Sequence, residues 1–254
     1  MRLFTIIIPC YNEGQRLSIC EYQNFLSSNK DCIIFVNDGS TDNTLLVLTN
    51  FLNKFPQQVL ILNLPNNVGK AEAIRLGVLL ALKETSNNLI GFMDADLATP
   101  FSEVEIIKYV FSQHNYKMIF GSRILRIGAH IHRFNTRHYL GRVMATLVSI
   151  YLDQPIYDSQ CGAKFFEPEI ANKIFIVPFV SRWLFDVEIF KRFLLLGYSL
   201  EDTCYELPLH TWIEKGGSKI SIWDFIKLPI EFVNIFLHYP NKDNCLDYRV
   251  LYQD

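Results

Sequence analysis

The stretch Asn88-Leu89-Ile90-Gly91-Phe92-Met93-Asp94-Ala95-Asp96 joins an apolar run to two carboxylates that are one residue apart. The apolar run predicts a buried strand over residues 89–93, and ligands bind at the ends of such strands in open α/β sheets. Two neighbouring acids repel each other unless a cation lies between them, and a divalent ion with oxygen ligands is the usual partner. Asp94 and Asp96 therefore fit a metal site, although the same pattern also occurs on solvated turns.

Strand and helix patterns alternate around this stretch. The apolar runs predict strands over residues 3–9, 31–37, 58–63, 89–93 and 117–121. The segments between them predict helices over residues 12–27, 41–55, 71–83 and 102–111. Near-continuous apolar strands separated by helices are typical of a parallel sheet that is covered on both faces. We therefore expect an α/β fold with a mostly parallel central sheet.

Composition limits the size, the location and the partners of the chain. Its 254 residues are half apolar, which suits one large domain, and its net charge of −2 argues against a nucleic-acid-binding protein. The six cysteines form no CxxC pair and three of them lie in or beside apolar segments, so we expect buried free thiols in a reducing cytoplasm. No uninterrupted apolar run reaches the roughly 18 residues that a membrane span needs. We expect a cytoplasmic protein, soluble or peripheral on the cytoplasmic face of the membrane.

Charge is unevenly distributed along the chain. Residues 106–152 contain no Asp or Glu, yet they hold seven Lys and Arg residues and four of the six histidines. Either a solvated basic face or an anionic partner explains this asymmetry, the partner being phosphate groups or an anionic membrane surface. The length of the acid-free run favours the anionic partner.

Polar loops follow the first three predicted strands. They are Pro9-Cys10-Tyr11-Asn12-Glu13, Asn37-Asp38-Gly39-Ser40 and Asn66-Asn67-Val68-Gly69-Lys70. No GxGxxG pattern follows the first strand, which argues against a dinucleotide-binding oxidoreductase. Asp38 can accept hydrogen bonds from a base or ribose, and a helix N-terminus beside Lys70 suits a diphosphate. Together with Asp94 and Asp96, these loops predict a site for a nucleoside diphosphate and a metal.

The order and spacing of the four loops over residues 5–96 resemble the nucleotide-binding half of an inverting, family-two GT-A glycosyltransferase. Four motifs lie farther along the chain: Gly121-Ser122-Arg123, Asp158-Ser159-Gln160-Cys161-Gly162, Arg182-Trp183-Leu184-Phe185-Asp186-Val187-Glu188 and Gly217-Ser218-Lys219. They resemble those of the polyprenyl-phosphate sugar synthases, and most closely those of the dolichyl-phosphate glucosyltransferases. The resemblance implies a GT-A domain over residues 1–219, with a nucleotide-binding half (1–100) and an acceptor half (101–219).

The resemblance also implies the donor and the residues that bind it. Ala98 occupies a position where mannosyl relatives carry a metal-binding glutamine, which favours the glucosyl branch and a UDP-hexose donor. Ala71 replaces a second glycine that the family often has, which is a mild change. Asp94 and Asp96 are implied to hold Mg²⁺ or Mn²⁺ on the diphosphate. The implied nucleotide contacts are Pro9, Tyr11, Glu13, Asp38, Gly69, Lys70 and Asp94.

The acceptor determines the chemistry expected of the second half. A lipid phosphate is already an anion and needs cations that position it, whereas a glycan hydroxyl needs a general base, for which Asp186 is the best candidate. The resemblance implies that Asp186 and Arg123 are catalytic residues. The implied acceptor and phosphate contacts are Arg123, Arg133, Arg137, Asp158, Gln160 and Lys219.

Several alternatives remain open at this point. Asp186 and Glu188 are either substrate-binding acids or solvated acids on a helix, and Arg182 is either a functional residue or the partner of one of them. A glycan hydroxyl in cell-surface polysaccharide synthesis is the alternative acceptor. A sugar-nucleotide-binding protein without catalytic activity is the alternative from another functional class.

Residues 220–254 begin with a strongly apolar segment that Pro229 and charged residues interrupt, so it does not fit a membrane span. Residues 220–237 could pack on the sheet, form an oligomer contact or lie in the membrane interface. Our hypothesis is that this segment and residues 143–152 form a monotopic surface that faces the membrane.

Overall fold

The structure is a computed structural model that describes residues 3–86, 89–132, 135–215 and 222–239, with the side chains of 135–140 and 222–228 left out. The strands are β1 (Phe4–Cys10), β2 (Cys32–Asp38), β3 (Val59–Leu64), β4 (Leu89–Phe92), β5 (Met118–Ser122), β6 (His130–His132), β7 (Lys164–Phe166), β8 (Cys204–Pro208) and β9 (Thr211–Ile213). The helices are α1 (Ile19–Ser28), α2 (Thr44–Lys54), α3 (Lys70–Glu84), α4 (Phe101–Gln113), α5 (Asn135–Leu152), α6 (Pro168–Phe175), α7 (Phe185–Leu195), α8 (Leu200–Thr203) and α9 (Ile222–His238).

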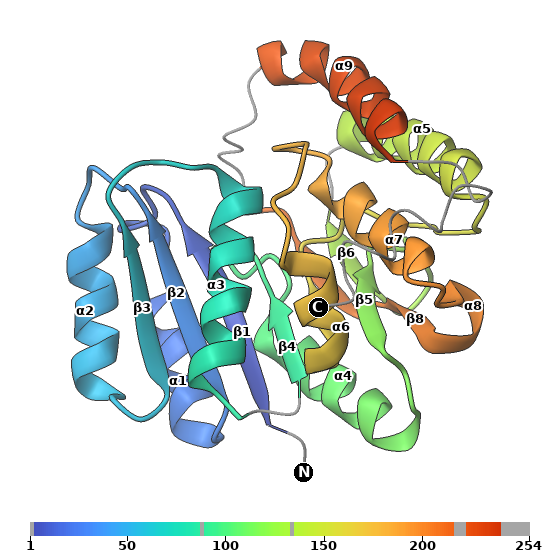
Figure 1. Ribbon diagram of the computed structural model, residues 1–254. Helices are drawn as coiled ribbons and strands as arrows, with labels where there is room; N and C mark the ends of the chain where they lie inside the picture. Colours follow the sequence, from blue (N-terminus) through green and yellow to red (C-terminus); the bar gives the residue numbers. More distant parts are fainter. Residues whose placement is uncertain (1–2, 87–88, 133–134, 216–221, 240–254) are drawn as a thin grey trace.

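The central sheet has the strand order β3-β2-β1-β4-β7-β5-β8 within the described residues (Figure 1). Neighbouring strands run parallel except β7, which is antiparallel to both β4 and β5. The expectation of a mostly parallel sheet is therefore confirmed. A separate two-stranded ribbon joins β6 to β9.

Helices cover both faces of the sheet. One face packs against α1, α2 and α4 through one apolar core, and the other packs against α3, α6 and α7 through a second core. Strand β1 shows why both faces are covered, because Ile6 and Ile8 point into the first core while Ile7 points into the second. A near-continuous apolar strand of this kind is typical of a sheet that is buried on both faces.

The carboxyl ends of β1, β2 and β4 meet at one edge of the sheet because these strands are parallel neighbours. The loop after β1 differs from the expected helix over residues 12–27, since α1 begins only at Ile19. Asn12 has a positive φ of 50°, which an α-helix does not accommodate. Its backbone N–H and side chain are bonded to Ser40 and Thr41 in the loop after β2. Residues 11–18 thus form a loop at the edge of the sheet.

Helices α5 and α9 lie side by side at the end of the molecule drawn uppermost in Figure 1. The ring of Tyr151 in α5 lies 5.4 Å from that of Phe232 and 5.8 Å from that of Phe236, both in α9. Although Pro229 interrupts the apolar segment in the sequence, α9 continues through it. Within the described residues, every helix is too short or too polar to cross a bilayer.

Candidate active site

Two loops join at the strand-end edge, where the loop after β1 binds the loop after β2. The backbone N–H of Glu13 donates to the hydroxyl of Thr44 (2.8 Å), and the N–H of Gly14 donates to the carboxylate of Asp42 (3.2 Å). The Thr41 N–H donates to the side-chain oxygen of Asn12 (2.8 Å). These bonds place Pro9 at the end of β1 and Tyr11, which is 38% exposed, at the surface directly after it. The predicted nucleotide contacts of this loop thus lie at the expected edge.

Asp38 shapes the third loop. One of its carboxylate oxygens accepts from the Val68 N–H (2.7 Å), and the other accepts from the Gly69 N–H (3.0 Å) and the Asn67 amide (2.9 Å). Gly69 precedes α3 with a φ of +94°, a conformation that side-chain-bearing residues rarely adopt. Asp38 therefore fixes the start of α3. A bond from Asp38 to a base or ribose stays a prediction.

Lys70 and Asp94 are brought together by α3 and β4. The Lys70 ammonium lies 2.5 Å from Oδ1 of Asp94. Although burial opposes it, this ammonium holds the pKa of Asp94 below its usual value. Gly162, from the second half of the chain, faces the same carboxylate: a Cβ at residue 162 would lie 2.2 Å from Oδ2 of Asp94. Asp94 therefore lies where the two halves of the chain meet, and the close approach requires glycine at 162.

Asp96 is held next to Asp94. Its Oδ1 accepts from the Ala98 N–H (3.0 Å), and its Oδ2 lies 3.4 Å from Arg16, which also contacts Glu13. Burial and the negative charge of Asp94 raise the pKa of Asp96.

The residues present fit a divalent metal. A cation would relieve the repulsion between Asp94 and Asp96, and carboxylate oxygens are ligands that Mg²⁺ and Mn²⁺ accept. Within the described residues, no group of three or more His, Cys, Asp or Glu side chains could surround an ion. A bound metal would therefore need further oxygen ligands, such as those of a diphosphate.

Arg123 and Asp158 form a two-pronged ion pair. Nε of Arg123 lies 2.7 Å from Oδ2 of Asp158, and Nη2 lies 2.7 Å from Oδ1. The Arg123 guanidinium also lies 5.3 Å from the ring of Trp212. Although burial opposes it, the Asp158 carboxylate raises the pKa of Arg123. Asp158 thus compensates much of the charge with which Arg123 could attract an acceptor.

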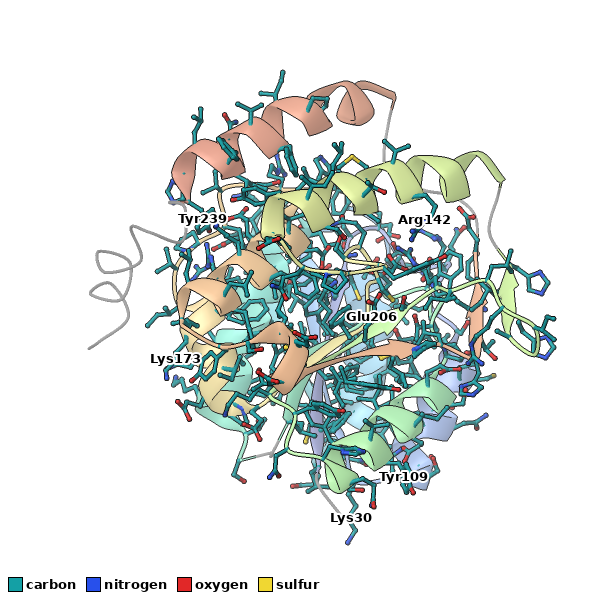
Figure 2. The ribbon with its side chains drawn as sticks, turned by 90° about the vertical axis from the view of Figure 1, so that its right-hand side faces the viewer. Lys30, Tyr109, Arg142, Lys173, Glu206 and Tyr239 are labelled. Atoms are coloured by element: carbon teal, nitrogen blue, oxygen red, sulfur yellow. The ribbon has the colours of Figure 1, made fainter. Side chains whose placement is uncertain are left out.

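The loop that carries Asp158 is fixed from β8. The Glu206 carboxylate, labelled in Figure 2, accepts from the backbone N–H groups of Tyr157 (2.9 Å) and Asp158 (2.7 Å). Two residues farther on, the side-chain nitrogen of Gln160 is buried and has no hydrogen-bond partner in the described part of the chain. A substrate role for Gln160 stays a prediction.

Asp186 lies in the first turn of α7 and pairs with Lys164 in β7. Nζ of Lys164 lies 2.6 Å from Oδ1 of Asp186 and donates to the carbonyl of Cys161 (2.7 Å). Asp186 is 5% exposed and Lys164 is fully buried. Burial raises the pKa of Asp186, and Lys164 offsets this only in part. The alternative of a solvated acid at Asp186 is therefore wrong.

Glu188 is a structural residue. It is fully buried and accepts hydrogen bonds from the backbone N–H groups of Val180 (3.0 Å) and Ser181 (2.6 Å) and from Tyr239 (2.6 Å). Its ion pair is with Arg192 (3.7 Å). Within the described residues no ion pair joins Arg182 to Asp186 or Glu188, so the alternative that Arg182 pairs with one of these acids is wrong.

Sequence reasoning missed Lys164. Its signal was a lysine within the apolar run Ala163-Lys164-Phe165-Phe166, because a buried lysine needs a carboxylate partner. Three predicted contacts, Arg133, Arg137 and Lys219, lie outside the side chains that the structure describes.

The described charged groups form one cluster. The charges of Asp94 and, more weakly, Asp186 raise the pKa of Lys70, although burial opposes this. Lys164 and Arg123 in turn lower the pKa of Asp94. The predicted donor residues and the predicted acceptor residues thus interact electrostatically at one site.

Comparison with known proteins identifies the family. Residues 5–175 match the model of glycosyl transferase family 2. Dolichyl-phosphate beta-glucosyltransferase ALG5C of Trichomonas vaginalis is 34% identical over 249 residues, which cover 92% of this chain and 71% of that protein. The dolichyl-phosphate beta-glucosyltransferase of Saccharomyces cerevisiae is 32% identical over 259 residues, covering 92% and 74%.

Solved structures share the fold. Glucosyl-3-phosphoglycerate synthase from Mycobacterium tuberculosis, in complex with Mn²⁺ and UDP-glucose, has a TM-score of 0.66 at 16% identity, covering 95% of this chain and 81% of that one. The expected GT-A fold is confirmed. The chain therefore belongs to glycosyl transferase family 2, as a hexosyltransferase related to the dolichyl-phosphate beta-glucosyltransferases.

Proposed function

We propose that this hexosyltransferase moves glucose from UDP-glucose to a polyprenyl phosphate of the dolichyl type, with inversion at the anomeric carbon. The names of the relatives support the sugar and the acceptor. Neighbours of the same fold that were solved with UDP and Mn²⁺ support the donor and the metal. The observation that carries the proposal is the position of Asp94 between Lys70 of the nucleotide-binding half and Gly162 of the acceptor half.

The residues of the chain suggest how the donor is bound. The loops fixed by Asp38 and Thr44 form the edge on which the nucleotide lies, and Lys70 at the start of α3 supplies a cation for the diphosphate. Asp94 and Asp96 would hold Mg²⁺ or Mn²⁺, which neutralises charge on the leaving diphosphate. As UDP leaves with the electron pair of its bond to the sugar, an oxygen of the acceptor phosphate forms the new bond from the opposite face.

An anionic acceptor needs positive charge rather than a base. Lys164 neutralises Asp186, so this buried carboxylate does not repel a phosphate that enters the site. Arg123 supplies hydrogen-bond donors next to the cluster, while Asp158 holds its orientation and compensates much of its charge. Arg133, Arg137 and Lys219 remain further candidate contacts.

A hydroxyl acceptor in polysaccharide assembly is the second candidate. The raised pKa of Asp186 favours it, because a carboxyl group whose pKa is raised accepts a proton more readily than an ordinary aspartate.

We further propose that helices α5 and α9 lie on an anionic membrane surface. Their outward side chains are large, apolar and at least 46% exposed, and they recur at helical spacing: Val143, Leu147, Ile150, Ile230, Val233, Phe236 and Leu237. Helix α5 also lies within the acid-free run of residues 106–152. An amphipathic helix with an apolar face and nearby basic residues fits a membrane interface.

One assay tests the donor and the acceptor together. UDP- and GDP-sugars are offered with a short polyprenyl phosphate or with a glycan acceptor, with and without Mn²⁺, and release of nucleoside diphosphate is followed. We expect release from UDP-glucose with the lipid phosphate and Mn²⁺. Turnover with the glycan alone would replace the first acceptor by the second, and turnover with GDP-mannose alone would overturn the donor assignment.

A further inference from the structure

The segment between α6 and α7 contacts the start of α3, which lies next to α6. A Cβ placed at Gly69 would lie 2.8 Å from Nη2 of Arg182, 3.0 Å from its Nε and 3.3 Å from its Cζ. The Arg182 guanidinium therefore lies directly against the backbone that precedes α3. Any larger residue at 69 would push the guanidinium away, in addition to straining a backbone with a φ of +94°.

This position makes Arg182 suitable for binding an anion. Its side chain is exposed, and within the described residues no carboxylate forms an ion pair with it. The neighbouring Lys70 ammonium already faces Asp94, at the site where a donor diphosphate is proposed to bind. The N-terminus of the 15-residue helix α3 thus has Arg182 against the residue that precedes it and Lys70 as its first residue. The guanidinium of an arginine can donate two parallel hydrogen bonds to the oxygens of one phosphate group.

Carboxylates hold the backbone on both sides of Arg182. Glu188 in α7 accepts from the N–H groups of Val180 and Ser181. Glu231 in α9 accepts from the hydroxyl of Ser181 and from the N–H of Trp183 (3.1 Å). Arg182 lies between these anchored residues, so its backbone has little freedom.

Helix α9 is also linked to this segment through Tyr239 and two residues of α7. Tyr239, which follows α9 (Figure 2), donates to Glu188 (2.6 Å) and accepts from Nε of Arg192 (2.8 Å). Arg192 also donates to the carbonyls of Val177 (2.6 Å) and Pro178 (2.7 Å). The position of α9 is therefore linked through buried bonds to the segment that carries Arg182.

We propose that Arg182 binds the diphosphate of the sugar-nucleotide donor and that Glu231 is its positioning residue, so that the seating of α9 sets the donor affinity. This rests on the proposed donor site and adds two residues, Arg182 and Glu231, that were not predicted from the sequence to bind the donor. Helix α9 also carries part of the proposed membrane surface, so one helix contacts both the lipid and the donor-binding segment.

The first experiment measures UDP and UMP binding by calorimetry with Mn²⁺ present. Replacement of Arg182→Ala is expected to weaken UDP binding about tenfold, as for the loss of one charge-assisted hydrogen bond, and to weaken UMP binding less. Lys83→Ala, which removes an equal charge at the far end of α3, is the matched control and should bind UDP as the wild type does. Equal UDP affinity in Arg182→Ala and the wild type would overturn the assignment. A wild-type chain that binds no UDP would instead overturn the donor site itself.

The second experiment tests the positioning residue. Glu231→Ala should weaken UDP binding several-fold, whereas Glu231→Gln keeps an acceptor oxygen for Ser181 and Trp183 and should restore most of the affinity. In an Arg182→Ala background, Glu231→Ala should have no further effect on UDP binding. If Glu231→Ala lowers the melting temperature without changing UDP affinity, Glu231 is only structural and the positioning role is wrong. If Glu231→Ala does not fold, Ser181→Ala is used instead, because it removes one of the two groups that donate to Glu231. It should likewise weaken UDP binding, and an unchanged UDP affinity would show that the positioning role is wrong.

Discussion

Lys164 and Asp186 form an ion pair in which the ammonium is fully buried and lies 2.6 Å from the carboxylate. One partner comes from an antiparallel strand in the middle of the sheet and the other from the first turn of α7. A buried pair contributes little to stability beyond a matched apolar pair, but removing one partner leaves an uncompensated charge.

The first prediction concerns stability. Lys164→Met should lower the free energy of unfolding by about 3–5 kcal/mol, because it leaves Asp186 buried without a cation. The double variant Lys164→Met with Asp186→Asn should recover part of this loss. Chemical denaturation measures both. Lys173→Met, which breaks an exposed pair with Glu169, is the control and should change stability by less than about 1 kcal/mol. A loss as small as the control's would mean that the pair is not buried in solution.

The second prediction separates the two acceptors by pH. A hydroxyl acceptor needs Asp186 as the carboxylate, so turnover should fall as the pH drops through its raised pKa, and Asp186→Asn should abolish turnover. A lipid phosphate needs no base. We therefore expect the rate with polyprenyl phosphate not to follow the titration of Asp186. Steady-state rates of the wild type and of Asp186→Asn are measured at several pH values. If the wild type loses activity in acid and Asp186→Asn is inactive, the hydroxyl acceptor is favoured.

The third prediction concerns the metal. Asp96→Asn keeps an oxygen that can accept from the Ala98 N–H, so the loop should persist while a charged metal ligand is lost. Turnover should fall about 1,000-fold or more, since a metal supplies several kcal/mol of transition-state stabilisation. Rates and Mn²⁺ binding are measured together, with circular dichroism as the check on folding. Normal turnover in this variant, or in the wild type after chelation, would refute the metal site.

The fourth prediction concerns the outer face of α5 and α9. Ile150→Asp and Phe236→Asp should each weaken co-sedimentation with anionic vesicles about tenfold, because each removes a large apolar side chain from the proposed interface. Leu46→Asp, at a residue of α2 that is 63% exposed, is the control. Wild-type protein that does not bind such vesicles at low salt would exclude this surface as a membrane contact.

The fifth prediction concerns the junction of the first two loops. Although burial opposes it, hydrogen bonds from the hydroxyl and N–H of Thr44 and from Gly14 lower the pKa of Asp42. A carboxylate whose pKa is lower in the folded than in the unfolded chain stabilises the fold at pH values above its unfolded pKa of about 4. This stabilisation is lost as the pH falls through the pKa of the folded chain. Because Asp42 is exposed, solvent weakens these interactions, and Asp42→Asn should cost less than about 1 kcal/mol at pH 7 and little in strong acid. Denaturation curves at both pH values measure this; an equal difference at both would contradict the role of its charge.

The sequence predicted the sheet and its loops because their causes are local. Apolar runs such as residues 89–93 form strands wherever both faces are buried, and the carboxyl ends of parallel strands share an edge. Asp94, Asp96 and Lys70 could be assigned to that edge before their distances were known. The helix expected from Asn12 failed because its backbone is fixed by Ser40 and Thr41, which are nearly thirty residues away.

The sequence by itself determined the α/β architecture and the polar loops of the donor site, since both follow from hydrophobic periodicity and from residues close together in the chain. Only the tertiary structure decided the partners of the buried charges. Lys164 meets Asp186 and Arg123 meets Asp158. The tertiary structure also decided that the exposed Arg182 lies against Gly69 instead of pairing with a nearby acid. The physical reason is that a buried charge must be compensated by whatever group the fold brings within a few ångströms, and sequence separation does not reveal that distance.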